Sequence, residues 1–192
     1  AFCTAVVVVG LVGPILTLCY WLTQGIFNGI DLPNLLKELV NSVVISSSAA
    51  LVTSICSIPV ALLTVRYPSI FSYILERLAF TGYALPGIVV ALSLVFLGIN
   101  LARPLYQTFW ILIFAYTVLF LPLALSTNRS SLLQISPILE ETALGLGRTR
   151  VQALFTPTLP QIRTGILMGI ALVFLVTIKE LPATMLLGPL GF

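Results

Sequence analysis

Apolar residues in this chain gather into long runs that contain no charged side chain. Residues 1–30, 39–65, 78–102 and 104–128 hold no Asp, Glu, Lys or Arg, and a shorter run covers 164–178. About 20 consecutive apolar residues cross the hydrocarbon core of a bilayer as a helix. The pattern therefore predicts five membrane helices, at roughly 2–23, 39–65, 79–99, 107–127 and 161–187.

The composition agrees with this pattern. Of the 192 residues, 59% are hydrophobic and only 8% are charged, whereas a soluble domain carries about 25% charged residues. A chain with so few charges cannot cover a water-facing surface. We therefore expect an all-α integral membrane protein, a polytopic bundle of about five transmembrane helices, with 1–192 as a single transmembrane domain.

The basic residues indicate which ends of the helices face the cytoplasm. Lys and Arg are enriched in the short cytoplasmic loops of membrane proteins. The segments 66–78 and 128–163 together hold six basic residues, and the segments on the other side hold only Lys37 and Arg103. We therefore expect 66–78 and 128–163 to be cytoplasmic.

Several kinds of chemistry have no support in the sequence. There is no histidine, and the three cysteines lie inside apolar runs, so no zinc cluster or Ser-His-Asp triad is expected. No GxxxxGK[ST] phosphate loop is present. The net charge of +3 comes from scattered residues, whereas nucleic-acid binding requires a clustered basic surface. We expect no zinc site, no directly bound cofactor and no nucleic-acid partner.

The second predicted span has a face of small residues, and each of the first four predicted spans contains a proline. Ser46, Ala50 and Ser54 recur every four residues, a spacing that lets helix backbones approach closely in lipid. We favour packing within the chain for this face; a subunit contact is the alternative. Each proline inside a span is expected to kink its helix; these are Pro14, Pro59, Pro86 and Pro122.

The segment 128–160 is polar, punctuated by glycine and flanked by apolar runs. Ser136-Pro137 is typical of a helix start, and Gly145 and Gly147 are expected to end that helix. Thr149-Arg-Val-Gln152 is a capping box that predicts a second short helix, which we expect Pro157 to end. The loop is thus predicted to be compact: a helix, a glycine hinge, a second helix and a turn into the last span.

The same segment resembles a known family. Glu141-x-Ala143-x-x-x-Gly147, followed by Leu159-Pro160, is similar to the EAA loop of permease subunits of binding-protein-dependent ABC importers, which have a MetI-like fold. Thr142 and Pro157 depart from the family's usual alanine and isoleucine, but the spacing is kept.

Two further stretches resemble the ferric-iron permeases within this group. Residues 179–192 begin Lys179-Glu-Leu-Pro-Ala-Thr, and residues 79–92 contain Tyr83-Ala-Leu-Pro-Gly87. Gly188 stands where those permeases usually have arginine. The resemblance implies the second half of a fused permease. The chain opens at Ala1 without a basic leader region, so we expect a piece of a longer protein; a processed N-terminus is the alternative.

The resemblance also implies function, partners and location. The EAA-like loop would dock on a cytoplasmic ATPase pair, a periplasmic binding protein would deliver ferric iron, and another permease half or copy would complete the pathway. The location would be the bacterial inner membrane, and ATP would be used by the partner, so the chain is expected to be non-catalytic. The ATPase-coupling residues carried over are Glu141, Ala143, Gly147, Leu159 and Pro160.

Lys179 and Glu180 are candidates for the substrate pathway, because ionisable groups inside a membrane indicate function. Glu180 would offer hard oxygen donors to ferric ion. They lie about 24 Å along the last span from Arg163 by helical rise, and Pro182 is expected to break the helix near them. Other readings stay open: a permease for sulfate, thiamine or a polyamine, an assembly scaffold, or an intramembrane enzyme.

Overall fold

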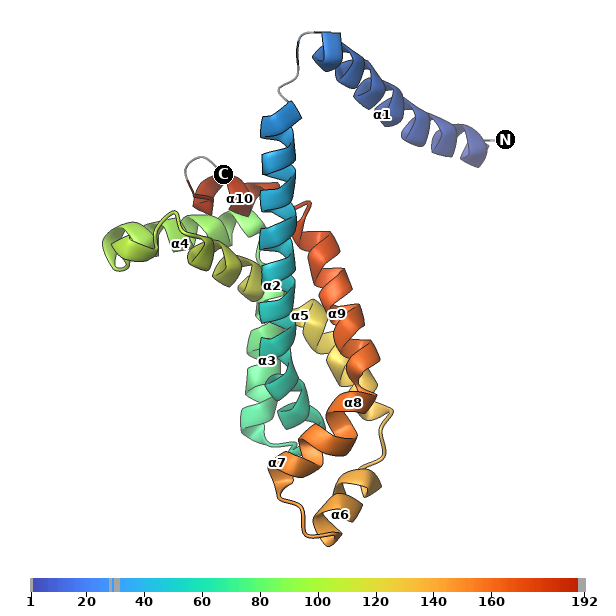
Figure 1. Ribbon diagram of the computed structural model, residues 1–192, viewed down its shortest axis with the longest axis vertical. Coiled ribbons are helices and arrows are strands. Elements are labelled where there is room, and N and C mark those ends of the chain that lie inside the picture. The colour runs from blue at the N-terminus through green and yellow to red at the C-terminus, as the bar shows by residue number, and fades with distance from the viewer. Residues whose placement is uncertain (1, 28, 30–31, 190–192) are drawn as a thin grey trace. The chain divides into compact units, whose positions relative to one another are not determined.

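A computed structural model describes residues 2–27, 29 and 32–189, and every regular element in these residues is helical (Figure 1). The contacts divide the chain into unit 1, residues 1–40, and unit 2, residues 41–192. The elements, in chain order, are α1 Phe2–Phe27, α2 Leu32–Arg66, α3 Ile70–Ala84, α4 Gly87–Asn100, η1 Arg103–Leu105, α5 Phe109–Leu133, α6 Ile138–Gly145, α7 Arg150–Ala153, η2 Leu154–Thr158, α8 Leu159–Gln161, α9 Arg163–Thr177 and α10 Leu181–Leu187.

The membrane-spanning helices are less regular than the apolar runs predicted. Among the described residues, three helices are long and apolar enough to cross a membrane, and two bent helix pairs raise the number to five if each pair is one span. The first, second and fourth predicted spans correspond to the continuous helices α1, α2 and α5. α2 begins seven residues before the predicted start, in the polar segment that contains Lys37.

The third predicted span, 79–99, is wrong as a single helix. α3 already begins at Ile70, inside the predicted 66–78 loop, and it meets α4 at an angle of 104°. The break falls at Leu85-Pro86, where both residues are extended. Proline has no N–H and disfavours helical geometry in the residue before it, so the helix stops there. Pro14, Pro59 and Pro122 instead lie inside continuous helices.

The fifth predicted span, 161–187, is also interrupted. The helical segment 150–161 bends by 67° into α9, and α9 ends at Thr177, before the three-residue break that leads to α10. Pro182 lies in the first turn of α10. The predicted break near Pro182 is therefore confirmed.

α5 forms the centre of unit 2 and packs against α3, α4, α9 and α10. The small-residue face of α2 belongs to unit 2 and is buried there: Ser46, Ala50 and Ser54 are 3%, 0% and 0% exposed. Thr53 on this face lies 3.3 Å from Thr117 of α5. The predicted packing of this face within the chain is confirmed.

Glycines bring the helices around α5 into close contact. A Cβ atom at Gly82 of α3 would lie 2.2 Å from the carbonyl oxygen of Val118 in α5. Gly165 and Gly169 of α9 face Ser131 and Thr127 of α5 in the same way. Such small-xxx-small spacing is a common packing device between helices in lipid.

Candidate functional site

The predicted cytoplasmic loop is folded at one end of unit 2. α2 and α5 end there, α3 and α9 begin there, and α6 and α7 lie beyond them (Figure 1). α6 ends at Gly145, and Gly147 follows with φ +82°, a left-handed conformation that favours glycine. Thr149 and Gln152 form the capping box that begins α7. The predicted order of helix, glycine hinge and helix is confirmed.

The expected end at Pro157 is wrong. Residues Leu154–Thr158 form a π-helical turn that contains Pro157, and the Leu159 N–H reaches back to the Leu154 carbonyl. Because proline has no N–H to donate, it leaves the Ala153 carbonyl without its usual partner, and a wider turn accommodates that gap. α7, this turn and α8 therefore follow one another without a loop.

The predicted coupling residues differ in exposure. Glu141 and Gly147 are exposed on the loop, Pro160 is exposed in α8, Leu159 is half-buried and Ala143 is buried. Glu141 thus points away from the interior of the chain, while Ala143 holds α6 against it.

Sequence reasoning missed the residue that ties this loop to the membrane helices. The Glu140 Oε1 atom accepts from Arg66 Nε at 2.9 Å and from the Thr158 hydroxyl at 2.9 Å. Arg66 Nη2 also donates to the Ile135 carbonyl at 3.0 Å. The Arg66 and Glu140 side chains are only 8% and 14% exposed. We call these four residues the loop clamp; it joins the end of α2, the start of α6 and the π turn.

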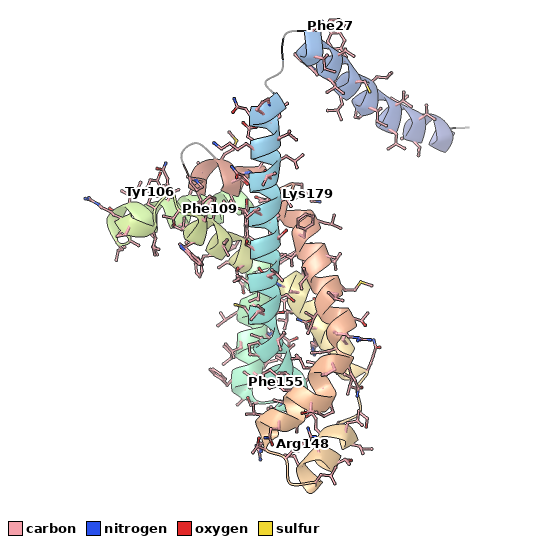
Figure 2. All side chains as sticks on the ribbon, viewed as in Figure 1. Phe27, Tyr106, Phe109, Arg148, Phe155 and Lys179 are labelled. Atoms are coloured by element: carbon pink, nitrogen blue, oxygen red, sulfur yellow. The ribbon has the colours of Figure 1, made fainter. Side chains whose placement is uncertain are left out.

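Apolar side chains of the loop point outward. Leu146 is 78% exposed, and Ile138, Val151 and Phe155 are exposed as well. Figure 2 shows Phe155 above Arg148 at this end of unit 2. Exposed apolar side chains of this kind are available for contact with a partner.

A second polar region lies where the two interrupted spans meet. Glu180 immediately precedes α10, and Gly87 begins α4. A Cβ atom at Gly87 would lie 2.3 Å from Glu180 Oε1. The carboxylate therefore rests on the first residue of α4, where the helix dipole favours a negative charge. The breaks at residues 85–86 and 178–180 are thereby brought together.

A cavity of about 140 Å³ lies beside this junction. Its lining includes Ser46 of α2, Tyr116 of α5, Thr177 of α9, Glu180 and Thr184 of α10. The Tyr116 hydroxyl lies 2.5 Å from the Thr184 hydroxyl, which also bonds the Glu180 carbonyl. Within the described part of the chain, the Thr177 hydroxyl and Glu180 Oε1 are buried and have no hydrogen-bond partner.

Lys179 and Glu180 occupy different environments. Lys179 is exposed, at the end of α9 (Figure 2), whereas Glu180 is half-buried; both line the cavity. Among the described residues, no group of three His, Cys, Asp or Glu side chains is placed to hold a metal ion.

Residues 54–192 match the family described as "Binding-protein-dependent transport system inner membrane component". The chain belongs to this family. A curated relative, the "Fe(3+)-transport system permease protein FbpB 2" of Haemophilus influenzae, is 40% identical over 188 residues, which are 97% of this chain and 37% of the relative. The chain thus spans a little over a third of the length of that protein.

The observed architecture agrees with membership in the binding-protein-dependent permease family. The all-helical fold and the apolar helices are those of a multi-pass inner membrane component. The match begins within α2 and includes both regions described above, the loop with its clamp and the junction of the interrupted spans.

Proposed function

We propose that this chain is part of the permease of an ATP-driven importer and that its cargo is ferric iron. The importer part of the proposal rests on the loop 128–160. It is a compact helical segment that the loop clamp holds to the end of α2, in a chain of this permease family. The cargo rests on the 40% identity with a relative whose name includes Fe(3+) transport.

The loop suits mechanical coupling because it is rigidly attached. The Arg66–Glu140 pair and the Thr158 bond connect α6 to α2 and to the segment that leads into α9. Movement of α6 would therefore move the ends of two helices rather than bend a loose linker. Transport then becomes a two-state change of the bundle, driven when ATP closes a partner dimer.

The contact with the partner would be made by the outward-facing side of the loop. Glu141 is exposed and free to meet a basic group, and Leu146, Val151 and Phe155 offer apolar contact. Gly147 permits the turn between α6 and α7. Leu159 and Pro160 belong to the segment that follows the π turn.

In this proposal the chain itself catalyses nothing and binds no cofactor directly. ATP is hydrolysed by a pair of cytoplasmic subunits, a periplasmic binding protein delivers the cargo, and a second permease half completes the pathway. Lys179 and Glu180 would lie along that pathway, at the junction of the interrupted spans.

The decisive experiment uses the full-length permease, reconstituted in liposomes with its ATPase. ATP hydrolysis is measured on adding the binding protein loaded with ferric ion, the same protein empty, and other loaded binding proteins. Stimulation by the iron-loaded protein alone is expected. Stimulation by a sulfate-, thiamine- or polyamine-loaded protein would keep the importer and discard iron. No stimulation in a competent complex would favour a scaffold or an intramembrane enzyme.

The coupling residues are tested in the same system. Glu141→Lys and Gly147→Asp are expected to uncouple transport from ATP hydrolysis while the protein still reaches the membrane. Gly145→Ala is the matched control, because Gly145 lies in open space and outside the left-handed region. Normal transport by both loop variants would overturn the assignment of the loop.

A further inference from the structure

We propose that the cavity at the junction of the interrupted spans is a transient binding site for a hard cation, with Tyr116, Thr177 and Glu180 as ligands. The inference rests on the proposed function, because ferric ion is the hard cation that such a permease would move. The inference adds to that function the residues that contact the cargo inside the membrane. It also assigns the side of the bundle on which the cargo passes.

The donor atoms on the cavity wall are those that a hard cation prefers. Ser46, Tyr116, Thr177 and Thr184 contribute hydroxyl groups and Glu180 a carboxylate. No thiol, thioether or imidazole is among the lining side chains. Carboxylate, hydroxyl and water oxygens suit hard ions, whereas soft ions select sulfur. A volume of about 140 Å³ also leaves room for waters that stay on the ion.

Two of these oxygens lack the partners that buried polar groups require. Thr177 is 2% exposed, and its hydroxyl has no hydrogen-bond partner among the described residues; Glu180 Oε1 is likewise buried and has none among them. An unsatisfied buried polar group costs about 1–3 kcal/mol, so such groups require an explanation. Both side chains line the same cavity, so a cation there would give the Thr177 hydroxyl a partner and attract the Glu180 carboxylate away from Gly87.

Tyr116 is held in place for the same role. It is 2% exposed, its ring stacks on Phe120, and Thr184 contacts both its hydroxyl and the Glu180 carbonyl. Because the Thr184 hydroxyl donates to that carbonyl, Tyr116 is the donor in the Tyr116–Thr184 bond. When ferric ion binds, the phenol O–H bond breaks, its proton passes to water and an O–Fe bond forms. The iron remains ferric throughout.

Lys179 keeps the binding weak. The Lys179 residue lines the same cavity as Glu180, and its positive charge repels a bound cation. Since Lys179 is exposed, its long side chain can move the charge toward water. A pathway site must release its ion as readily as it takes it up, and a nearby ammonium favours release.

Because Lys179 and Glu180 carry opposite charges, removing one or the other should change cation binding in opposite directions. The full-length permease in lipid nanodiscs, without ATPase, is titrated with ferric ion presented as its nitrilotriacetate complex. Binding is read from the visible charge-transfer band that an iron–phenolate bond produces. Glu180→Gln should weaken binding and Lys179→Gln should tighten it, each by on the order of tenfold. Thr177→Val should weaken it by a smaller factor.

Two variants serve as controls. Tyr116→Phe keeps the stacked ring and should abolish the band, and its unfolding temperature shows that the fold persists. Thr81→Val removes an exposed hydroxyl that donates to the Arg77 carbonyl within α3 and should leave the titration unchanged. A band that survives Tyr116→Phe, or no band in the wild type, overturns the site.

The same variants separate a cation from an anionic iron chelate. Weaker binding in Lys179→Gln, with no change in Glu180→Gln, would mean that an anion occupies the cavity and would overturn the inference. ATPase stimulation is measured in parallel. Stimulation by iron-loaded binding protein without a band rejects the site and keeps the proposed function. A band without such stimulation rejects iron import and keeps the cation site.

Discussion

At the scale of single residues, the position of the Glu180 carboxylate depends on the absence of a side chain at Gly87. The Glu180 Oε1 atom occupies the space that a Cβ atom at Gly87 would need. The tip of a glutamate side chain can rotate away at little cost. A methyl group at this position should therefore move the carboxylate without damaging the fold.

Gly87→Ala tests this directly. We expect the unfolding temperature of the full-length permease in detergent to change little, and cargo transport to fall several-fold because Glu180 is displaced. Gly98→Ala is the control: its Cβ atom would meet the Tyr106 side chain instead. Unchanged transport in Gly87→Ala would show that the position of the carboxylate does not matter.

At the scale of helices, close contact between α3 and α5 depends on Gly82. Its missing Cβ faces a backbone carbonyl, that of Val118, and a carbonyl inside a helix cannot turn away as a side chain can. Gly82→Ala is expected to push α3 from α5 and to destabilise the protein by about 1–3 kcal/mol, as overpacking does.

Thermal unfolding in detergent measures this effect, with Gly87→Ala as the matched comparison, because both variants add one methyl group to a glycine of the bent pair α3 and α4. The expected order is a clear loss for Gly82→Ala and a small one for Gly87→Ala. Equal losses would contradict the distinction between a backbone neighbour and a side-chain neighbour.

The loop clamp connects three elements through one carboxylate. Glu140→Gln removes its charge and leaves the mostly buried Arg66 guanidinium unpaired. We expect a loss of about 2 kcal/mol, below the ~3–5 kcal/mol of fully buried pairs. We also expect ATP hydrolysis to become less responsive to cargo, because α6 is no longer held to α2.

The matched control for the clamp is Glu141→Gln, which removes the neighbouring, exposed carboxylate and should not change stability. The two variants are compared by thermal unfolding, and the ratio of transport to ATP hydrolysis in Glu140→Gln is compared with that of the wild type. If Glu140→Gln matched the wild type in both measurements, the clamp would have no role in coupling.

At the scale of the whole molecule, the distribution of basic residues predicts the orientation of unit 2. Arg66, Arg148 and Arg150 lie at the end of unit 2 that carries the loop, and that end is expected to be cytoplasmic. Arg103 lies in the connection that leads into α5, at the opposite end of that helix.

Cysteine labelling checks the orientation. In a full-length permease whose own cysteines are replaced by serine or alanine, a cysteine at Arg148 should react with a membrane-impermeant maleimide only in inverted vesicles. A cysteine at Arg103 should react in intact cells with a permeabilised outer membrane. The reverse labelling pattern would show the opposite orientation, in which the loop could not reach a cytoplasmic partner.

The sequence by itself determined the features that depend on local composition and spacing. Uncharged apolar runs require a membrane, and the order of capping residues and glycines in 136–152 determined α6, the hinge and α7, because these signals act over three or four residues. The EAA-like spacing and the 179–192 stretch were likewise visible and agree with the family that the chain matches.

Only the tertiary structure decided which distant residues meet. Arg66 and Glu140 are 74 positions apart, and nothing local to either predicts the pair. Pro86 and Pro182 indicated breaks in two spans, but the apolar runs could not show that α3 and α4 meet at 104°, because hydropathy measures the solvent and not the path of the backbone. The contact of Glu180 with Gly87 follows from α4 packing on α10, and the cavity lined by Tyr116 and Thr177 exists only because five segments converge there.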